Sequence, residues 1–341
     1  MRIFVAGATG AIGRRLLPLL LDGGHQVTAM TRHPAKAAGL RAAGADPVVA
    51  DALDREAVLA AVTAARPEVV VHELTDLAGM RDFRKVDQGF AATNRLRTEG
   101  TDNLLAAARA AGARRFVAQS FAGWPFARTG GPVKTEDDPL DPDPPAALRP
   151  TLDAIRHLEA AVLGAPGLEG LVLRYGGFYG PGTSAGDGGL MLDDLRRRRF
   201  PLVGAGTGVW SFVHIDDAAA ATAAAVERGA PGIYQIVDDD PAPVSAWLPA
   251  MAAAAGAPPP RRVPAWLARP LAGEHGLVLM TEVRGASNAK ARRELGWQPA
   301  HRSWREGFPT SLGAASAGTP GHGSAAGVAQ PAWPGLTRPD S

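Results

Sequence analysis

A glycine-rich turn between the first apolar run and the first helical pattern constrains the fold of this chain more than any other feature. Arg2–Ala6 is a short apolar run, and Gly7-Ala8-Thr9-Gly10-Ala11-Ile12-Gly13 follows it directly, where helical spacing begins. Glycines there permit a tight turn and let the backbone approach a pyrophosphate, which the positive end of the helix attracts. The segment therefore predicts a dinucleotide site; the alternative is a tight turn in an unrelated α/β protein.

Short apolar runs alternate with longer helical patterns over the first half of the chain. This alternation is typical of an α/β fold in which a doubly wound parallel sheet carries helices on both faces. We therefore expect a Rossmann-type sheet followed by a smaller C-terminal substrate domain. The expected strands are Arg2–Ala6, His25–Met30, Pro47–Ala50, Val69–His72, Arg115–Gln119 and Leu171–Tyr175, and the expected helices are Ile12–Leu21, Arg55–Ala64, Thr93–Ala111 and Thr151–Val162.

The regular pattern loosens near Gly180, where segments rich in glycine and proline begin. We expect residues 1–180 to form the dinucleotide-binding domain, with returns to the sheet at Val209–His214 and Gly232–Val237, within residues 209–240. Residues 181–308 are then mainly substrate-binding. Residues 309–341 are almost all glycine, alanine, serine, proline and threonine, and because they have little to bury we predict a disordered tail.

Composition excludes several classes of function. The 36 Lys and Arg residues nearly balance the 34 Asp and Glu residues, which disfavours a nucleic-acid partner. The absence of cysteine excludes disulfides, thiolate metal sites and cysteine nucleophiles. No run approaches the ~20 apolar residues of a membrane span, and no secretion signal is evident, so we expect a cytoplasmic protein without a membrane partner.

Seven separated segments give the chain a resemblance to a known family. It is similar to the extended short-chain dehydrogenases/reductases, the NAD-dependent epimerase/dehydratase branch, from Met1 to about Pro309. The resemblance implies the Rossmann fold and a nicotinamide cofactor. The segments are Gly7–Gly13, Val49-Ala50-Asp51-Ala52-Leu53-Asp54, Val70-Val71-His72, Gly100-Thr101-Asp102-Asn103-Leu104-Leu105, Arg174-Tyr175-Gly176-Gly177-Phe178-Tyr179-Gly180-Pro181-Gly182, Phe212-Val213-His214-Ile215-Asp216-Asp217-Ala218 and Leu295-Gly296-Trp297-Gln298-Pro299.

The end of the second expected strand indicates which cofactor is preferred. An NAD site places a carboxylate there for the ribose 2′-hydroxyl, whereas an NADP site offers a cation to the 2′-phosphate. This chain has Thr31-Arg32-His33 and no carboxylate between Asp22 and Asp46. We therefore predict NADPH/NADP, with Arg32 as the phosphate ligand; the alternative is a solvated arginine.

The resemblance implies the rest of the cofactor site. Asp51, Ala52 and Leu53 would flank the adenine, and the backbone around Glu73–Thr75, with Leu74 at its centre, would pass the ribose. Gly177 and Phe178 would lie near the nicotinamide.

The active site of this family normally depends on a Tyr-x-x-x-Lys pair that moves a proton. The three tyrosines here, Tyr175, Tyr179 and Tyr234, are not followed by lysine at the required spacing. Counting back from Glu159, which matches a family glutamate, puts Thr151 in the tyrosine position and Ile155 in the lysine position. Neither side chain transfers a proton at neutral pH.

Three residues are candidates for the catalytic work that remains. Ser120 matches the family hydroxyl near the nicotinamide, or it only bonds the end of its strand. His157 has a suitable pKa in general, but it lies about 200° around the helix from Ile155 and could face solvent or a partner subunit. Tyr175 could orient a carbonyl, as could Tyr179, although packing is the commoner role for both.

Two further features of the sequence, at Arg97 and around His214, do not support a catalytic role. Arg97 stands three residues before Gly100, where many relatives have asparagine, and this puts the usual proton-relay water in doubt. His214 with Asp216 and Asp217 matches a family segment that is ordinarily structural. We therefore predict no metal site.

We predict an NADPH-dependent ketoreductase in which water or the substrate itself supplies the proton. The chain is similar to atypical actinobacterial relatives that reduce aromatic polyketide ketones, including angucyclinones of the simocyclinone type, and its four lysines against 32 arginines fit such a GC-rich source. The alternatives are a catalytically silent NADPH-binding sensor or scaffold, and a sugar-nucleotide epimerase or dehydratase. The aromatic residues that would line a flat apolar pocket, or equally lie in the core, are Trp124, Trp210, Phe212, Trp247 and Trp266.

The expected partners are a small-molecule ketone substrate and a second copy of the chain. Relatives form a four-helix dimer interface from the helices that correspond to Thr98–Ala111 and Thr151–Val162, whose alanine-rich faces would permit close packing. Alternatively, Arg97, Arg109 and Arg156 make these faces too charged and the protein is a monomer.

Overall fold

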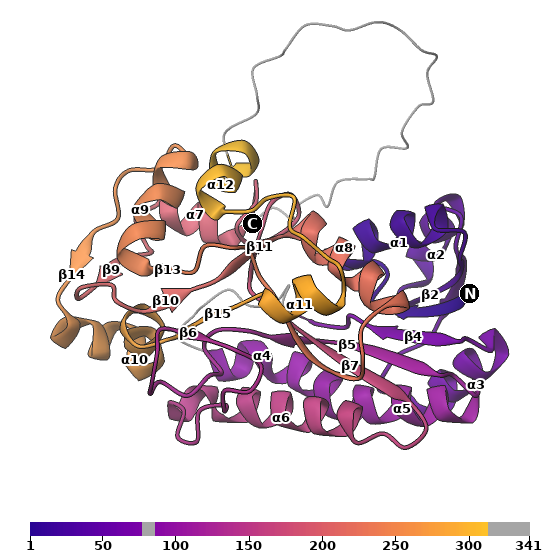
Figure 1. Ribbon diagram of the computed structural model, residues 1–341. Helices are drawn as coiled ribbons and strands as arrows, with labels where there is room; N and C mark the ends of the chain where they lie inside the picture. The colour runs from indigo at the N-terminus through magenta and orange to yellow at the C-terminus, as the bar shows by residue number, and fades with distance from the viewer. Residues whose placement is uncertain (77–85, 313–341) are drawn as a thin grey trace, which may run out of the picture.

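The computed structural model describes residues 1–76 and 86–312, and its centre is one parallel sheet (Figure 1). All seven strands run the same way, and β1 lies between β2 and β4, so the chain reverses direction across the sheet at β1. This is the strand arrangement of a Rossmann fold. In spatial order the strands are β12 (Gly232–Ile236), β7 (Glu169–Tyr175), β5 (Arg115–Phe121), β4 (Val69–His72), β1 (Arg2–Ala6), β2 (Gln26–Thr31) and β3 (Asp46–Val49).

Helices cover both faces of the sheet (Figure 1), and each face has its own apolar core. Strand alternation divides the residues, because Val69 and Val71 face one core and Val70 faces the other. On one side lie α1 (Gly13–Asp22), α2 (Ala37–Ala42), α8 (Ile215–Glu227) and α11 (Ala289–Glu294); on the other lie α3 (Arg55–Ala65), α4 (Val86–Arg95), α5 (Thr101–Ala110) and α6 (Arg149–Leu163).

A π-helical turn, η3 (Leu96–Gly100), joins α4 to α5. The sequence predicts one helix over Thr93–Ala111, and the structure differs because the helix starts earlier and widens at this turn. The wider turn buries the long side chain of Arg97, which is only 5% exposed. Turns of this type often occur at functional sites.

The C-terminal part of the chain packs beyond the strand ends around a third apolar cluster, which contains Trp247, Trp304 and Phe308. Its helices are α7 (Leu190–Arg196), α9 (Val244–Ala254), α10 (Ala265–Thr281) and α12 (Trp304–Leu312). Short strand pairs connect it to the rest: β8 (Gly177–Tyr179) with β11 (Phe212–His214), β10 (Val209–Trp210) with β13 (Ala242–Pro243), β9 (Leu202–Val203) with β14 (Arg262–Val263), and β6 (Val133–Lys134) with β15 (Gly285–Ala286).

Most expected strands are present to within two residues, but two expectations are wrong. Val209–His214 does not return to the main sheet, because β10 and β11 pair with β13 and β8 instead. The expected tail begins too early, because α12 continues through Pro309 to Leu312, which is 1% exposed. Residues 313–341 lie outside the described part. Gly232–Val237 does return, as β12.

Within the described ranges, no helix combines the length and the hydropathy needed to cross a membrane.

Candidate active site

The glycine turn has the geometry that a dinucleotide requires. Gly7 follows β1 directly and has a φ of 103°, and a Cβ added to it would lie 2.6 Å from the carbonyl oxygen of Glu73. A Cβ on Gly13 would lie 2.2 Å from the carbonyl oxygen of Gly7. Any side chain would collide with this tightly folded backbone, so both glycines are required by space. The observation fits a cradle for a pyrophosphate at the start of α1.

The other predicted cofactor residues lie along the same edge of the sheet, at or after the strand ends. Asp51 is exposed and its Oδ1 accepts a hydrogen bond from the Leu53 amide at 3.0 Å. The Ala52 carbonyl accepts from Asn103 Nδ2 at 3.0 Å, and the Leu74 amide donates to His72 Nδ1 at 3.3 Å. Their contacts with a cofactor stay predictions. Of the remaining predicted residues, Ala8 and Ile12 are buried in the core, and Thr9, Gly10, Ala11, Gly177 and Phe178 are partly or fully exposed.

Arg32 lies at the end of β2, as the sequence suggests, but it already has an acidic partner. Its Nη2 donates to Asp76 Oδ2 at 2.9 Å, and its Nε donates to His33 at 3.1 Å. The side chain is 51% exposed. A bound 2′-phosphate would compete with the Asp76 carboxylate for this guanidinium. Asp76 is 44 residues away in the sequence, and the sequence pattern did not predict that it would pair with Arg32.

A buried carboxyl group lies beside the glycine turn. Glu73 follows β4 directly, and Tyr175 at the end of β7 donates to its Oε1 at 3.0 Å. Burial raises the pKa of Glu73 to about 8, although the hydrogen bond from Tyr175 opposes this shift. Its Oε2 is buried without a hydrogen-bond partner. Glu73 is therefore protonated at neutral pH, which keeps a negative charge away from the phosphate cradle.

Tyr175 is fully buried, and its hydroxyl lies between Glu73 and Thr222, whose Oγ1 is 2.6 Å away. Burial raises the pKa of Tyr175 well above its usual value. These contacts give Tyr175 a packing and hydrogen-bonding role under the cofactor cradle. A catalytic role for it stays a prediction.

The positions of the missing Tyr-x-x-x-Lys pair are buried on α6. Thr151 and Ile155 are each 1% exposed. Asn94 Nδ2 donates to Thr151 Oγ1 at 3.1 Å, so an asparagine does lie at the vacant tyrosine position. The sequence predicts Arg97 at the place where many relatives have asparagine; Arg97 lies three residues after Asn94, within the π-helical turn. Neither Thr151 nor Asn94 supplies an acidic proton.

Ser120 is directed away from the open part of the site. It is 1% exposed, and its Oγ donates to Glu159 Oε1 at 2.7 Å. Arg174 binds both oxygens of the same carboxylate, from Nε at 2.8 Å and from Nη2 at 2.6 Å. Ser120 shares a strand face with Phe116 and Ala118, so alternation along β5 was a signal that it faces the helices. Its catalytic role stays a prediction, which this burial does not favour.

Arg97 completes the buried polar cluster. Burial lowers its pKa to about 10, the opposing attraction comes from Glu159, and its Nη1 is buried without a partner. Two arginines thus surround one carboxylate on the helix side of the strand ends.

His157 lies on the outer surface, where its Nε2 is 2.8 Å from Asp102 Oδ1 on α5. Its side chain is 41% exposed. The structure brings it close to α5 and does not bring it to Ser120 or Tyr175 by any contact in the described chain.

A small hollow, with a cavity volume of only about 30 Å³, lies at the carboxyl ends of β5 and β7, where ligands bind in folds of this type. Phe121, next to Ser120 in β5, contributes to its wall, as does Gly177 of β8. Of the predicted pocket aromatics, Trp124 and Trp210 line it. Phe212 and Trp247 lie in the core at 2% and 0% exposure, and Trp266 is a surface residue at 74%. The remaining lining residues are Ala122, Gly123, Val209, Ser211, Leu279 and Val283.

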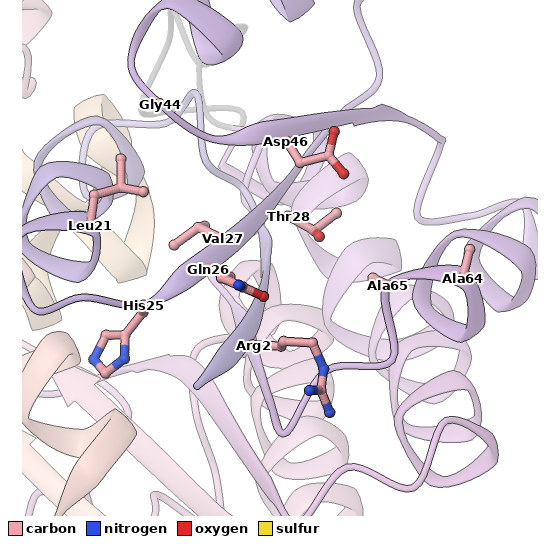
Figure 2. A pocket seen from close by; sticks show the side chains of 10 residues that line it. All are labelled: Arg2, Leu21, His25, Gln26, Val27, Thr28, Gly44, Asp46, Ala64 and Ala65. Atoms are coloured by element: carbon pink, nitrogen blue, oxygen red, sulfur yellow. The ribbon is translucent and has the colours of Figure 1, made fainter.

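Figure 2 shows a second hollow, which lies at the opposite edge of the sheet. Its wall includes Arg2, Gln26 and Asp46, the first residues of β1, β2 and β3. Parallel strands begin at the edge opposite their carboxyl ends, so this hollow is remote from the glycine turn.

His214, Asp217 and His301 form a compact cluster whose donor atoms lie within 4.8 Å of one another. The Asp217 carboxylate already accepts from the Ala300 amide, the His301 amide and His301 Nδ1, at 2.8, 2.9 and 3.0 Å. The two imidazoles stack with centroids 3.8 Å apart. These contacts give the cluster a structural role, because they hold α8 against the segment before α12.

Fold and site together define a dinucleotide-binding protein of the Rossmann type. The model of the NAD dependent epimerase/dehydratase family matches residues 3–236, and the chain belongs to this family.

Named relatives are reductases. The chain is 53% identical over 313 residues to a 3-diazoavenalumate denitrifying reductase from a Streptomyces species. The matched region covers 90% of this chain and 99% of that reductase. It is 30% identical over 251 residues to a 4-hydroxy-2-methyl-3-oxo-4-farnesyl-3,4-dihydroquinoline-1-oxide ketoreductase from Stigmatella aurantiaca, covering 73% and 71%. The fold is that of the UDP-glucose 4-epimerase of Thermotoga maritima, with a TM-score of 0.71 at 22% identity, covering 92% and 97%. The protein is therefore an oxidoreductase.

Proposed function

We propose that this protein is an NADPH-dependent reductase of secondary metabolism that replaces an aromatic diazo group by hydrogen and donates no proton of its own. The observation that carries the proposal is the loss of the proton-transferring pair. Thr151, in the tyrosine position, is hydrogen-bonded to Asn94, and Ile155, in the lysine position, has no ionisable group. The 53% identity to a 3-diazoavenalumate denitrifying reductase, over nearly the whole of both chains, supports the diazo group as the target.

The proton balance of the reaction fits this site. A ketone needs a hydride and a proton to become an alcohol, so its reductases keep a proton donor. An aryl diazonium ion and a hydride give an arene and N2. The C–N bond breaks with its electron pair leaving on nitrogen, a C–H bond forms from the hydride pair, and no proton is consumed. A family member without the Tyr-x-x-x-Lys pair can complete this reaction.

The chain's own residues fit the cofactor at several points. The amides of the Gly7–Gly13 turn would hold the pyrophosphate, and Arg32 would bind the 2′-phosphate after leaving Asp76. Protonated Glu73 leaves the cradle without an opposing charge. When bound, the reduced nicotinamide supplies the hydride.

The aromatic residues around the small hollow would contact the substrate, which is too large to enter a cavity of about 30 Å³. Phe121 and Trp124 have ring centroids 6.4 Å apart, and the Nε1 of Trp210 is occupied by the Leu279 carbonyl at 2.8 Å. These rings suit contact with the face of a flat aromatic molecule. The residues orient the substrate by stacking, and the reaction depends on that orientation.

A second candidate is the reduction of an aromatic ketone, and the ketoreductase among the relatives favours it. In that case a phenol or enol beside the ketone would supply the proton, because the site does not. The same aromatic residues would contact the polycyclic substrate.

A turnover experiment separates the two candidates. The protein is incubated with NADPH and either 3-diazoavenalumate or a 2-hydroxyaryl ketone, and N2 release, NADPH oxidation and the products are followed. We expect N2 and the denitrogenated product in equal amounts with the NADPH consumed. Reduction of the ketone alone, with loss of activity on its methyl ether, would replace the first candidate by the second. Turnover of neither would contradict both.

The proposal also includes a cytoplasmic location and a homodimer formed through α5 and α6. The outer surfaces of these helices carry the His157–Asp102 pair and alanine side chains. Sedimentation velocity tests the dimer, with a monomeric species at micromolar concentration as the contrary result.

A further inference from the structure

Arg97 is a buried cation with an unsatisfied hydrogen-bond donor. It lies on the π-helical turn η3 and is 5% exposed, so a small part of the residue is still accessible. Its Nη1 is buried and has no hydrogen-bond partner in the described chain. A buried donor without an acceptor costs free energy, and the cost is greater when the donor is charged. An acceptor bound from outside the protein would remove this cost.

The charges around Arg97 do not balance. Arg174 binds both oxygens of Glu159, from Nε at 2.8 Å and from Nη2 at 2.6 Å, and Ser120 donates to Oε1 at 2.7 Å. One arginine thus already neutralises the carboxylate that attracts Arg97. Burial, with a smaller contribution from the charge of Arg97, lowers the pKa of His72 to about 4, so this imidazole is neutral at pH 7. The described cluster therefore carries one positive charge in excess.

The excess charge lies beside the positions of the lost Tyr-x-x-x-Lys pair. Asn94, three residues before Arg97, donates to Thr151 in the tyrosine position at 3.1 Å. Glu159 lies one helical turn after Ile155, which stands in the lysine position. Because the family pair exchanges a proton with the substrate, a substrate oxygen would come close to Arg97 here. A guanidinium suits a negatively charged oxygen, which it can bind through two N–H groups.

The proposed reaction also favours an anion at this place. A positive charge beside the site opposes hydride donation, because the nicotinamide becomes a cation when the hydride leaves it. It also opposes the approach of a diazonium group, which is itself a cation. A substrate that carries its own negative oxygen would balance Arg97 and remove both effects.

We infer that Arg97 is the anion-binding residue of this site and that it recognises a negatively charged oxygen of the substrate, either a carboxylate or a phenolate. The inference rests on the proposed function for the reaction itself, whereas anion binding is measurable without turnover. It gives the substrate a second required feature, an oxyanion in addition to the group that is reduced.

The test compares anions with neutral molecules of nearly the same shape. Benzoate is paired with benzamide, and 4-nitrophenolate at pH 8 with 4-nitroanisole. Binding to the full-length protein is measured by titration calorimetry, with and without NADPH. We expect at least one anion to bind the wild type about tenfold or more tightly than its neutral partner, because a charged acceptor bonds Arg97 more strongly. The pair that shows the preference identifies the kind of oxygen.

Two variants of Arg97 connect this preference to the residue. Arg97→Met removes the charge and should abolish the preference, whereas Arg97→Lys keeps the charge without the planar fork and should retain part of it. Benzoate, or the nitrophenolate where that pair shows the preference, should also raise the urea midpoint of the wild type but not that of Arg97→Met.

Arg174→Met is the matched control, since it makes the same substitution in the same cluster but removes the partner of Glu159. We expect this control to lose stability in urea, because it leaves the buried carboxylate without its bound arginine. Arg97→Met should be at least as stable as the wild type, because it removes the unbalanced charge. A merely structural Arg97 would instead make both variants less stable.

Three results would overturn the inference. Equal binding of both anions and their neutral partners to the wild type would mean that water alone satisfies Arg97. A loss of stability in Arg97→Met as large as in Arg174→Met would make Arg97 a structural counter-ion of Glu159. Weaker NADPH binding in Arg97→Met, with the anion preference unchanged, would assign Arg97 to a cofactor phosphate. An anion preference that depends on Arg97 supports the inference even where no N2 is released with NADPH, a result that would reject the proposed reduction alone.

Discussion

Two regions at the same edge of the sheet differ in how much of the family pattern they keep. The cofactor cradle at Gly7–Gly13 is complete, whereas the proton relay at Thr151 and Ile155 is gone. The cradle consists of backbone packed so tightly that an added Cβ would lie 2.2 Å from a carbonyl oxygen. The relay consists of side chains, which change without moving the backbone. Cofactor binding and proton transfer are therefore separable in this fold, and a reaction that needs only hydride can lose the second.

The largest expected effect comes from filling the cradle. Gly13→Ala places a methyl group against the Gly7 carbonyl, and the backbone must move because the methyl group is fixed to the Cα and cannot turn away. We expect NADPH binding to weaken by about 100-fold or more, or about 2.7 kcal/mol. Nicotinamide fluorescence titration measures it. Gly131→Ala is the control outside the cradle, because the nearest atom to an added Cβ there is 3.9 Å away, and equal losses in both variants would contradict the steric explanation.

Cofactor preference should depend on one ion pair in the cradle region. Arg32→Ala removes the cation expected to bind the 2′-phosphate, and we expect NADPH affinity to fall by about 30-fold while NADH affinity changes little. Parallel titrations with both cofactors measure this.

Asp76→Asn is the companion variant, since it frees Arg32 from its 2.9 Å partner and should tighten NADPH binding by a few fold. Equal effects of Arg32→Ala on both cofactors would remove the phosphate assignment.

The protonated carboxyl beside the cradle predicts a pH dependence of stability. Burial raises the Glu73 pKa from 4.5 to about 8, so the folded protein binds a proton that the unfolded chain releases over this range. Stability should therefore fall as pH rises from about 4.5 to about 8 and then level off. Glu73→Gln keeps an acceptor for Tyr175 and should be more stable than wild type at pH 8 by about 4 kcal/mol, and equal to it near pH 4.

Urea unfolding at several pH values measures this difference. Asp238, whose pKa burial also raises to about 8, should leave part of the slope in the variant. A variant with the wild-type slope would show that Glu73 is ionised in the folded protein.

On the relay side, Ser120→Ala distinguishes a structural hydroxyl from a catalytic one. The buried hydrogen bond to Glu159 predicts a loss of about 1.5 kcal/mol in unfolding free energy and less than about threefold in kcat. Contact with the reacting group would instead lower kcat by about 10- to 100-fold. Measurement of both quantities on the same sample decides between them.

The smallest effect is expected at the surface of α6. His157→Gln breaks the exposed pair with Asp102, which contributes no more than about 1 kcal/mol. Turnover and its pH profile should stay as in the wild type. A profile that loses its acid limb would give His157 a catalytic part.

The sequence predicts this fold well because the main strands are local apolar runs joined by helices of ordinary spacing. Its errors arise where a long-range partner decides the outcome. Two-residue strands such as Val209–Trp210 have no pattern of their own, and their pairing with Ala242–Pro243 depends on tertiary packing.

The site follows the same division. The cradle was predictable because glycine spacing is a local requirement. The Arg32–Asp76 pair and the burial of Glu73 were not, since each joins separate strands. The direction of Ser120 was available from alternation along β5, whereas no residue pattern predicts the π-helical turn in which Arg97 lies.

The burial of all three tyrosines, Tyr175, Tyr179 and Tyr234, also affects the ultraviolet absorbance of the protein. In the folded protein the phenol band in the ultraviolet should not shift with alkali until the pH nears 12, the pKa to which burial raises that of Tyr234. Any phenolate absorbance below that point comes from unfolded chains or from a tyrosine introduced by substitution. The native protein therefore has no phenolate absorbance of its own below about pH 12. The phenolate band of one tyrosine introduced by substitution would then report on the surroundings of that residue.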